Sequence, residues 1–138
     1  MPRRNHVLTV ELGTPPTGGW EPGLAVTANG NNAEGTMIVV PASAATADHI
    51  VGWTLNAGNE GDIAPLRTMI DGTVFAKMSA NAYPYAEGGR AWLTNDGSGM
   101  LLNNFSEADQ DNCAITLAPL TAEGWVEVLI LRQKYITL

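Results

Sequence analysis

Short apolar runs separated by turn residues recur along the whole chain. Val, Ile, Thr and Trp dominate these runs, and no long window shows the sustained stripe of an amphipathic helix. The runs predict strands at Val7 to Leu12, Gly23 to Ala28, Thr36 to Val40, Ile50 to Leu55, Thr73 to Met78, Arg90 to Thr94, Ala114 to Leu117 and Trp125 to Leu131. The pattern predicts an all-β fold with little helix, a small β-barrel or sandwich with long loops.

Pairs of Asn or Asp with Gly mark the expected tight turns, because glycine adopts positive φ without steric cost. These pairs are Asn29-Gly30, Asp71-Gly72 and Asp96-Gly97. Asp71-Gly72 lies between the apolar runs Leu66 to Ile70 and Thr73 to Met78, so it predicts a β-hairpin. Helix is expected for at most a turn or two, at Ser79 to Tyr85 or at Ser106 to Asp111.

The last predicted strand, Trp125 to Leu131, is apolar at nearly every position. A strand that is covered on one face only should alternate between apolar and polar residues. Either this strand is covered on both faces by its own chain, or one face packs against another subunit. The residues on one side of it, Trp125, Glu127, Leu129 and Leu131, are therefore candidates for an oligomer interface.

A short sequence pattern, the Thr-Leu echo, occurs at two of the predicted hairpins. Gly52-Trp53-Thr54-Leu55 is followed by Glu60-Gly61, and Ile115-Thr116-Leu117 is followed by Glu123-Gly124. In both places a strand that ends in Thr-Leu leads through a turn to a new strand. Two similar hairpins on a barrel would give this pattern, and a match of this length also arises by chance.

Composition indicates a protein with much neutral surface. The chain has 138 residues, of which 45% are hydrophobic and 15% charged, whereas about 25% charged residues is typical of soluble domains. We expect one domain, with residues 1–6 as a flexible N-terminal arm and residues 7–138 as the barrel-like body. Neutral exposed surface is often contact surface, so composition favours a binding protein.

The charges are unevenly placed along the chain. Between Glu11 and Glu127 there are 14 acidic residues and only three basic ones, which gives 3 − 14 = −11 for that stretch and −7 for the whole chain. Such an acidic body repels phosphate backbones, so we expect no nucleic-acid partner. Arg3 and Arg4 precede this stretch and suit an arm that binds a negatively charged neighbour.

The cysteine content and hydropathy favour folding in the cytoplasm. Cys113 is the only cysteine, so an internal disulfide is not possible. The N-terminal arginines are not followed by the apolar segment of a signal peptide, and no run of 18 apolar residues occurs. We expect synthesis in the cytoplasm and no membrane partner.

The order of segments resembles the capsid decoration, or cement, proteins of tailed bacteriophages. The resemblance covers about residues 23–131 and depends on the succession of Gly23-Leu24-Ala25-Val26, Ile50 to Leu55, Glu60 to Ile63, Met69 to Lys77, Gly88 to Gly97, Cys113 to Leu117, Glu123-Gly124 and the apolar last strand. It implies a structural virion protein, made in the host bacterial cytoplasm, that assembles as a homotrimer. It further implies binding to the major capsid protein on the capsid exterior, where the protein would clamp and stabilise neighbouring subunits.

Four residues are candidates for capsid binding under this resemblance. Arg3, Arg4 and His6 lie in the predicted arm, and Trp20 lies in a Gly- and Pro-rich loop where a large ring suits an interface. Trp53 and Trp92 lie inside predicted strands, which favours the core. The segment Asn29 to Asp48 is longer than in the simplest decoration proteins, and is either an extra contact element or a surface insertion.

No residues form a recognisable catalytic or metal-binding motif. His6 and His49 have no nominated nucleophile or orienting acid, and Cys113 opens an apolar run, where a free cysteine usually packs as a small hydrophobe. The acids Glu107, Asp109 and Asp111 lack the glycine and the final glutamate of a calcium loop. We therefore expect no enzyme activity and no cofactor. The alternatives are another virion module, from a tail or fibre, and a small ligand-binding barrel.

Overall fold

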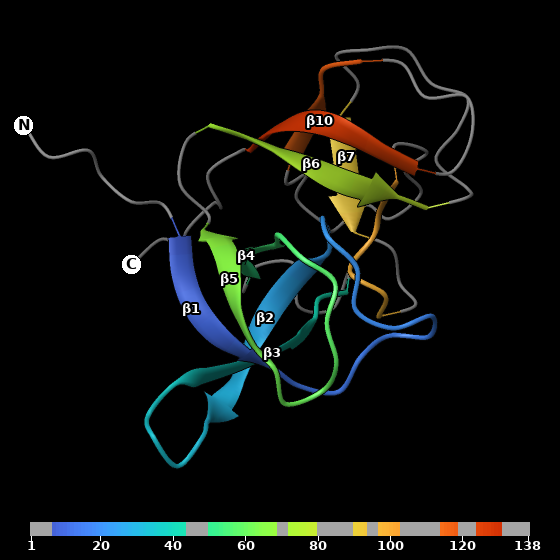
Figure 1. The fold of residues 1–138 in the computed structure, drawn as a ribbon. Helices are drawn as coiled ribbons and strands as arrows, with labels where there is room; N and C mark the ends of the chain where they lie inside the picture. The colour runs from blue at the N-terminus through green and yellow to red at the C-terminus, as the bar shows by residue number, and fades with distance from the viewer. Residues whose placement is uncertain are drawn as a thin grey trace, which may run out of the picture.

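The computed structural model describes residues 7–43, 50–68, 72–79, 90–93, 97–102, 114–118 and 124–130. These ranges contain strands and no helix, which confirms the predicted all-β class (Figure 1). The strands are β1 (Val7–Leu12), β2 (Ala25–Asn31), β3 (Met37–Pro41), β4 (Ile50–Thr54), β5 (Ile63–Thr68), β6 (Thr73–Met78), β7 (Arg90–Leu93), β8 (Leu101–Leu102), β9 (Ala114–Thr116) and β10 (Gly124–Ile130). The part of the chain described holds no helix long and apolar enough to cross a bilayer.

The strands close into two five-stranded barrels that follow one another along the chain. The first barrel has the order β1-β3-β2-β4-β5, and the second has the order β10-β6-β8-β7-β9. In Figure 1 the first barrel lies at the lower left, and the second lies above it and to the right. Closure removes free sheet edges, which limits uncontrolled strand pairing with other chains.

Two of the predicted turns have a different role in the structure. Gly72 has the expected positive φ of 130°, but the hairpin predicted around it is wrong, because β5 pairs with β1 and β4 whereas β6 pairs with β10 and β8. This glycine therefore marks the passage from one barrel to the next. Asn29-Gly30 lies inside β2 at an irregularity in its pairing with β3, and the reversal itself follows at residues 32–36.

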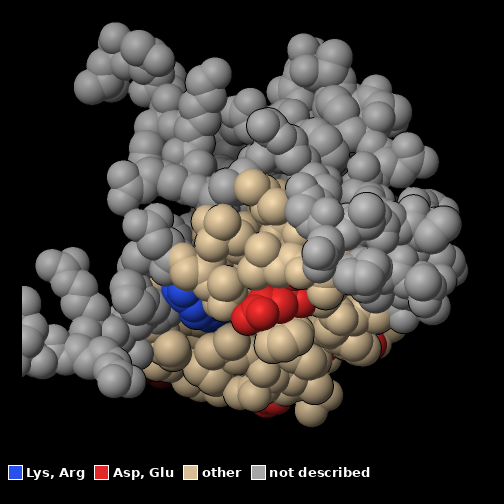
Figure 2. Space-filling model, turned by 90° about the horizontal axis from the view of Figure 1, so that it is seen from above, with Lys and Arg blue, Asp and Glu red and all other residues tan. Residues whose placement is uncertain are grey.

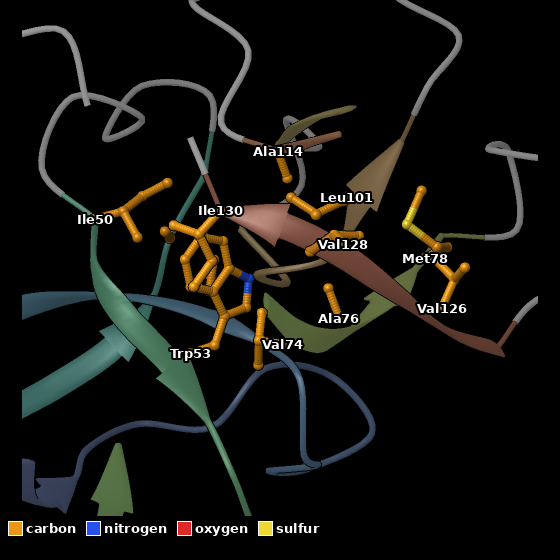
Figure 3. Close-up of a cluster of buried hydrophobic side chains, with 12 residues drawn as sticks. Ile50, Trp53, Val74, Ala76, Met78, Leu101, Ala114, Val126, Val128 and Ile130 are labelled. Atoms are coloured by element: carbon orange, nitrogen blue, oxygen red, sulfur yellow. The ribbon is translucent and has the colours of Figure 1, made fainter. Parts of the chain in front are cut away.

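Each barrel has a hydrophobic core, and one tryptophan connects the two. Trp53 belongs to β4 of the first barrel, yet its fully buried side chain packs in the cluster formed mainly by the second barrel. Figure 3 shows its indole reaching toward Val74, Val128 and Ile130. The prediction that Trp53 is a core residue is confirmed. The structure does not describe the side chain of Trp92, so its place in the core stays a prediction.

Backbone hydrogen bonds also join the barrels at Gly23. Its N–H donates to the carbonyl of Thr54 at 2.7 Å, and its carbonyl accepts the N–H of Lys77 in β6 at 2.9 Å. Gly23 has a φ of 81°, and a Cβ at this position would lie 2.5 Å from the carbonyl oxygen of Phe75. The junction therefore requires glycine for both its conformation and its close backbone approach.

Candidate contact surface on the second barrel

The outward face of β6 and β10 carries three of the four large exposed apolar side chains that the structure describes in the second barrel. Phe75 is 62% exposed, Trp125 44% and Leu129 38%, and Leu117, just after β9, is 40% exposed. The register pairs Phe75 with Glu127 and Lys77 with Trp125, so these side chains share one side of the sheet. We call Phe75, Leu117, Trp125, Glu127 and Leu129 the contact surface.

Strand β10 alternates in burial despite its nearly continuous apolar sequence. Val126, Val128 and Ile130 point into the core, while Trp125 and Leu129 on the opposite face remain exposed and Glu127 is half-buried. The alternative in which this strand is covered on both faces by the described chain is therefore wrong. Leu131, the fourth residue of the predicted interface, lies outside the described residues.

Charge is sparse on the side of the molecule where β10 and β6 lie. Figure 2 shows this side, and its described surface is largely uncharged, with a basic patch beside an acidic patch near the centre and smaller acidic areas at the edges. Within the contact surface the acid is Glu127, whose Oε2 accepts a hydrogen bond from the Thr73 hydroxyl at 3.1 Å. A largely neutral surface with an isolated polar group is typical of the centre of a protein–protein interface.

Trp125 is held in place by two groups. Its Nε1–H donates to the carbonyl of Pro22 at 2.6 Å, and the Lys77 ammonium lies 5.1 Å from the ring centroid, in the range of a cation–π contact. Lys77 also forms an ion pair with Glu21. Because the ring is already ordered, Trp125 loses little side-chain entropy when a partner covers it.

An apolar hollow opens beside Phe75, at the junction of the two barrels. Its volume is about 310 Å³, and its described lining is Pro22, Gly23, Thr54, Leu55, Arg67, Thr73, Val74 and Phe75. Such a hollow suits an apolar side chain from a partner, because fully desolvated pockets of this kind hold the residues that dominate binding energy. A second hollow of about 520 Å³ lies near Pro15 and Ser98, and its described lining contains no acid or base.

The structure corrects the role predicted for Trp20. This side chain is only 3% exposed and packs in the core of the first barrel. Its Nε1–H donates to the carbonyl of Gly13 at 2.9 Å, and its backbone bridges that of Gly58. The Gly- and Pro-rich loop thus folds back and buries the ring, because a buried indole gains both apolar burial and an acceptor for its N–H. Trp20 is therefore removed from the candidate capsid contacts.

The remaining candidate residues fall outside the described part of the chain. These are Arg3, Arg4 and His6 of the arm, together with His49, Cys113, Glu107, Asp109 and Asp111. Within the described ranges, no group of three or more His, Cys, Asp or Glu is placed to hold a metal ion. The roles of the arm residues stay predictions.

Phe75 and Leu117 are surface residues that sequence reasoning did not select. The segment Thr73-Val74-Phe75-Ala76-Lys77-Met78 alternates in the structure, with Val74, Ala76 and Met78 inward. Its period of two was visible in the sequence and could have placed Phe75 on the face opposite the core. Leu117 follows the end of β9, and no comparable pattern marks it.

Comparison with known proteins finds a solved structure with a similar fold. The chain is similar to the N base of the head fibre protein gp8.5 of bacteriophage phi29, with 11% sequence identity and a TM-score of 0.61. The match covers 95% of this chain and 98% of that one. At this identity the likeness shows a shared fold over nearly the whole chain. No protein-family description matches the sequence, and no curated protein matches it.

Proposed function

We propose that this chain is a structural protein of a tailed-bacteriophage virion that attaches to the outer surface of the head. The observation that carries the proposal is the shared fold, over nearly the full length of both chains, with the base of a phage head fibre. The order of sequence segments independently resembles phage decoration proteins. Both similarities indicate a phage head, although the solved neighbour is a fibre base and not a decoration protein.

In this proposal the protein binds the major capsid protein and clamps neighbouring subunits, with no chemical step and no cofactor. The exposed apolar contact surface supports a binding role, here toward other copies of the chain, because apolar patches of this kind usually mark interaction sites. Repetition of modest contacts over a symmetric shell then gives a firm attachment through avidity.

We further propose that the protein assembles as a homotrimer through the contact surface. Replacing Phe75 and Leu129 together with serine should raise the concentration for half-assembly at least tenfold, because two ordered apolar anchors are lost. Both side chains are exposed in the monomer, so the melting temperature should change little. Sedimentation equilibrium measures the assembly, and Ala28→Ser, an exposed substitution on β2, is the matched control. Trimers that persist unchanged in the double variant would contradict this use of the surface.

A separate prediction concerns the role of the N-terminal arm in capsid attachment. Deleting residues 1–6 should leave the melting temperature unchanged and weaken binding to capsid shells, because Arg3 and Arg4 would pair with carboxylates on the shell. Each such exposed pair contributes about 1 kcal/mol or less, so the loss depends on repetition across the oligomer. Added salt should weaken the full chain more than the truncated one. If the Arg3→Gln/Arg4→Gln variant binds shells as tightly as the unaltered chain, the arm is not part of the interface.

A fibre base is a second candidate role, favoured because the solved neighbour is itself the base of a phage head fibre. The two roles differ in the number of copies on each head, because a decoration protein covers the whole lattice whereas fibres occupy selected sites. Counting copies on purified virions by quantitative mass spectrometry, relative to the major capsid protein, distinguishes them.

A further inference from the structure

The two barrels have the same strand connectivity. If β1 to β5 are matched in order with β6 to β10, the ring β1-β3-β2-β4-β5 becomes β6-β8-β7-β9-β10, which is the observed order of the second barrel. The single parallel pairing also corresponds, since β1 pairs in parallel with β3 and β6 in parallel with β8. The other pairings are antiparallel in both barrels.

The register agrees residue by residue as well as strand by strand. In the first barrel Thr54 of β4 is opposite Leu66 of β5, and in the second Thr116 of β9 is opposite Val128 of β10. If this match is extended from strand to strand around both barrels, each residue pair of the second barrel has an equivalent pair in the first barrel. For the pair Gly124 and Met78 the counterpart is the backbone hydrogen bond from Leu12 to Asp62.

Irregular contacts at the barrel ends correspond too. The N–H of Gly13, just after β1, donates to the carbonyl of Val39 at 2.8 Å, and the N–H of Ser79, just after β6, donates to the carbonyl of Leu101 at 2.8 Å. The Thr-Leu echo in the sequence falls on equivalent positions, 54–55 and 116–117. Its Glu-Gly part is displaced by one residue, since Asp62, and not Gly61, corresponds to Gly124. We infer that the chain consists of two copies of one five-strand module.

This equivalence gives the contact surface a counterpart on the first barrel. Equivalent outward positions are Val7 and Thr73, Thr9 and Phe75, Glu11 and Lys77, Ile63 and Trp125, Pro65 and Glu127, and Arg67 and Leu129. Ile63 is 58% exposed and its counterpart Trp125 is 44% exposed, so both barrels have an exposed apolar side chain at this position. We call the outward face of β1 and β5, with Val7, Glu11, Ile63 and Arg67, the first-barrel face.

The two faces differ in charge. Glu11 on the first-barrel face corresponds to Lys77 on the second barrel, and Glu60 and Asp62 directly precede Ile63. The equivalent end of the second barrel carries the Lys77–Glu21 pair instead. The first-barrel face carries the acid Glu11 and the base Arg67, and the contact surface carries the acid Glu127. Arg67 of one copy and Glu127 of the next therefore have opposite charges when a first-barrel face binds a contact surface.

We propose that the contact surface of one copy binds the first-barrel face of the next copy, head to tail. The proposal rests on the self-association put forward above and names the surface that receives it. Heterologous contacts of this kind close into a ring when the rotation between copies allows it, which is the type of contact that a homotrimer requires. Contact surfaces that bound each other would instead give a twofold dimer.

Mixing two variants tests the head-to-tail arrangement directly. One variant carries Val7→Ser with Ile63→Ser, and the other carries Phe75→Ser with Leu129→Ser; all four side chains are exposed, and thermal melts confirm that each variant folds. Sedimentation velocity is then run on each variant alone and on an equimolar mixture. At concentrations where the unaltered protein is trimeric, each variant alone should be monomeric, because each lacks one of the two faces.

The mixture should form a 1:1 dimer, since the intact contact surface of the first variant meets the intact first-barrel face of the second. This dimer should dissociate at a concentration at least tenfold above that of the trimer, because the ring is not closed. If the Val7→Ser/Ile63→Ser variant assembles like the unaltered protein, the head-to-tail arrangement is wrong while self-association through the contact surface stands. An unaltered protein that remains monomeric overturns both.

Discussion

Replacing Trp53 with alanine is expected to lower the free energy of unfolding by about 3–5 kcal/mol, the range for a large aromatic removed from a packed core. Trp53 is fully buried and belongs to a strand of the first barrel while packing with the second. Its loss leaves a cavity at the place where the barrels share their cores. Urea unfolding followed by circular dichroism gives the change in free energy.

Trp53→Phe is the matched control for this prediction. The Nε1–H of Trp53 is buried and has no hydrogen-bond partner among the described residues, so its removal breaks no hydrogen bond seen there. Phenylalanine also keeps most of the apolar ring. We therefore expect Trp53→Phe to cost less than half as much as Trp53→Ala. Equal costs for the two variants would contradict this prediction, because the phenyl ring would then recover none of the packing that Trp53→Ala loses.

Gly23→Ala is expected to cost more than about 2 kcal/mol, because two penalties combine at this position. A left-handed conformation costs a residue with a Cβ about 1–2 kcal/mol, and Gly23 has a φ of 81°. The new Cβ would also lie 2.5 Å from the Phe75 carbonyl oxygen and 2.9 Å from the Lys77 nitrogen. Relief of that clash has to separate the Gly23 segment from β6, which breaks the backbone bond to Lys77.

Gly18→Ala separates the two penalties. Gly18 has a φ of 96°, similar to that of Gly23, but an added Cβ there meets no atom within 4 Å. This control should therefore show the conformational cost alone. The prediction fails if the two alanine variants unfold at the same urea concentration, since the close approach between the barrels would then contribute nothing.

The strands could be predicted from the sequence because their residues carry local information. The run Val7 to Leu12 is β1 with the same bounds, and the period of two in β10 placed Trp125, Glu127 and Leu129 on one face. Strand partners could not be predicted in the same way. Asp71-Gly72 has the chemistry of a hairpin turn, but the residues that pair with the flanking strands lie far away in the chain.

Trp20 shows a second limit of local reasoning. A glycine- and proline-rich loop is usually exposed, and nothing within it reveals that its backbone pairs with Gly58 or that the Trp20 ring packs in the core of the first barrel. The duplication shows the same limit. Only the Thr-Leu echo marks it in the sequence, whereas the matching of two complete strand registers requires the three-dimensional pairing.

Co-sedimentation with capsid shells of the tailed phage proposed to carry this chain tests the proposed function most directly. Purified protein is mixed with expanded shells and, in parallel, with unexpanded precursor shells, and the bound fraction is measured after pelleting. We expect saturable binding to expanded shells and no binding to the precursors, because clamping requires the subunit spacing of the mature lattice. Protein that stays in the supernatant with expanded shells at every concentration would contradict attachment to the head surface.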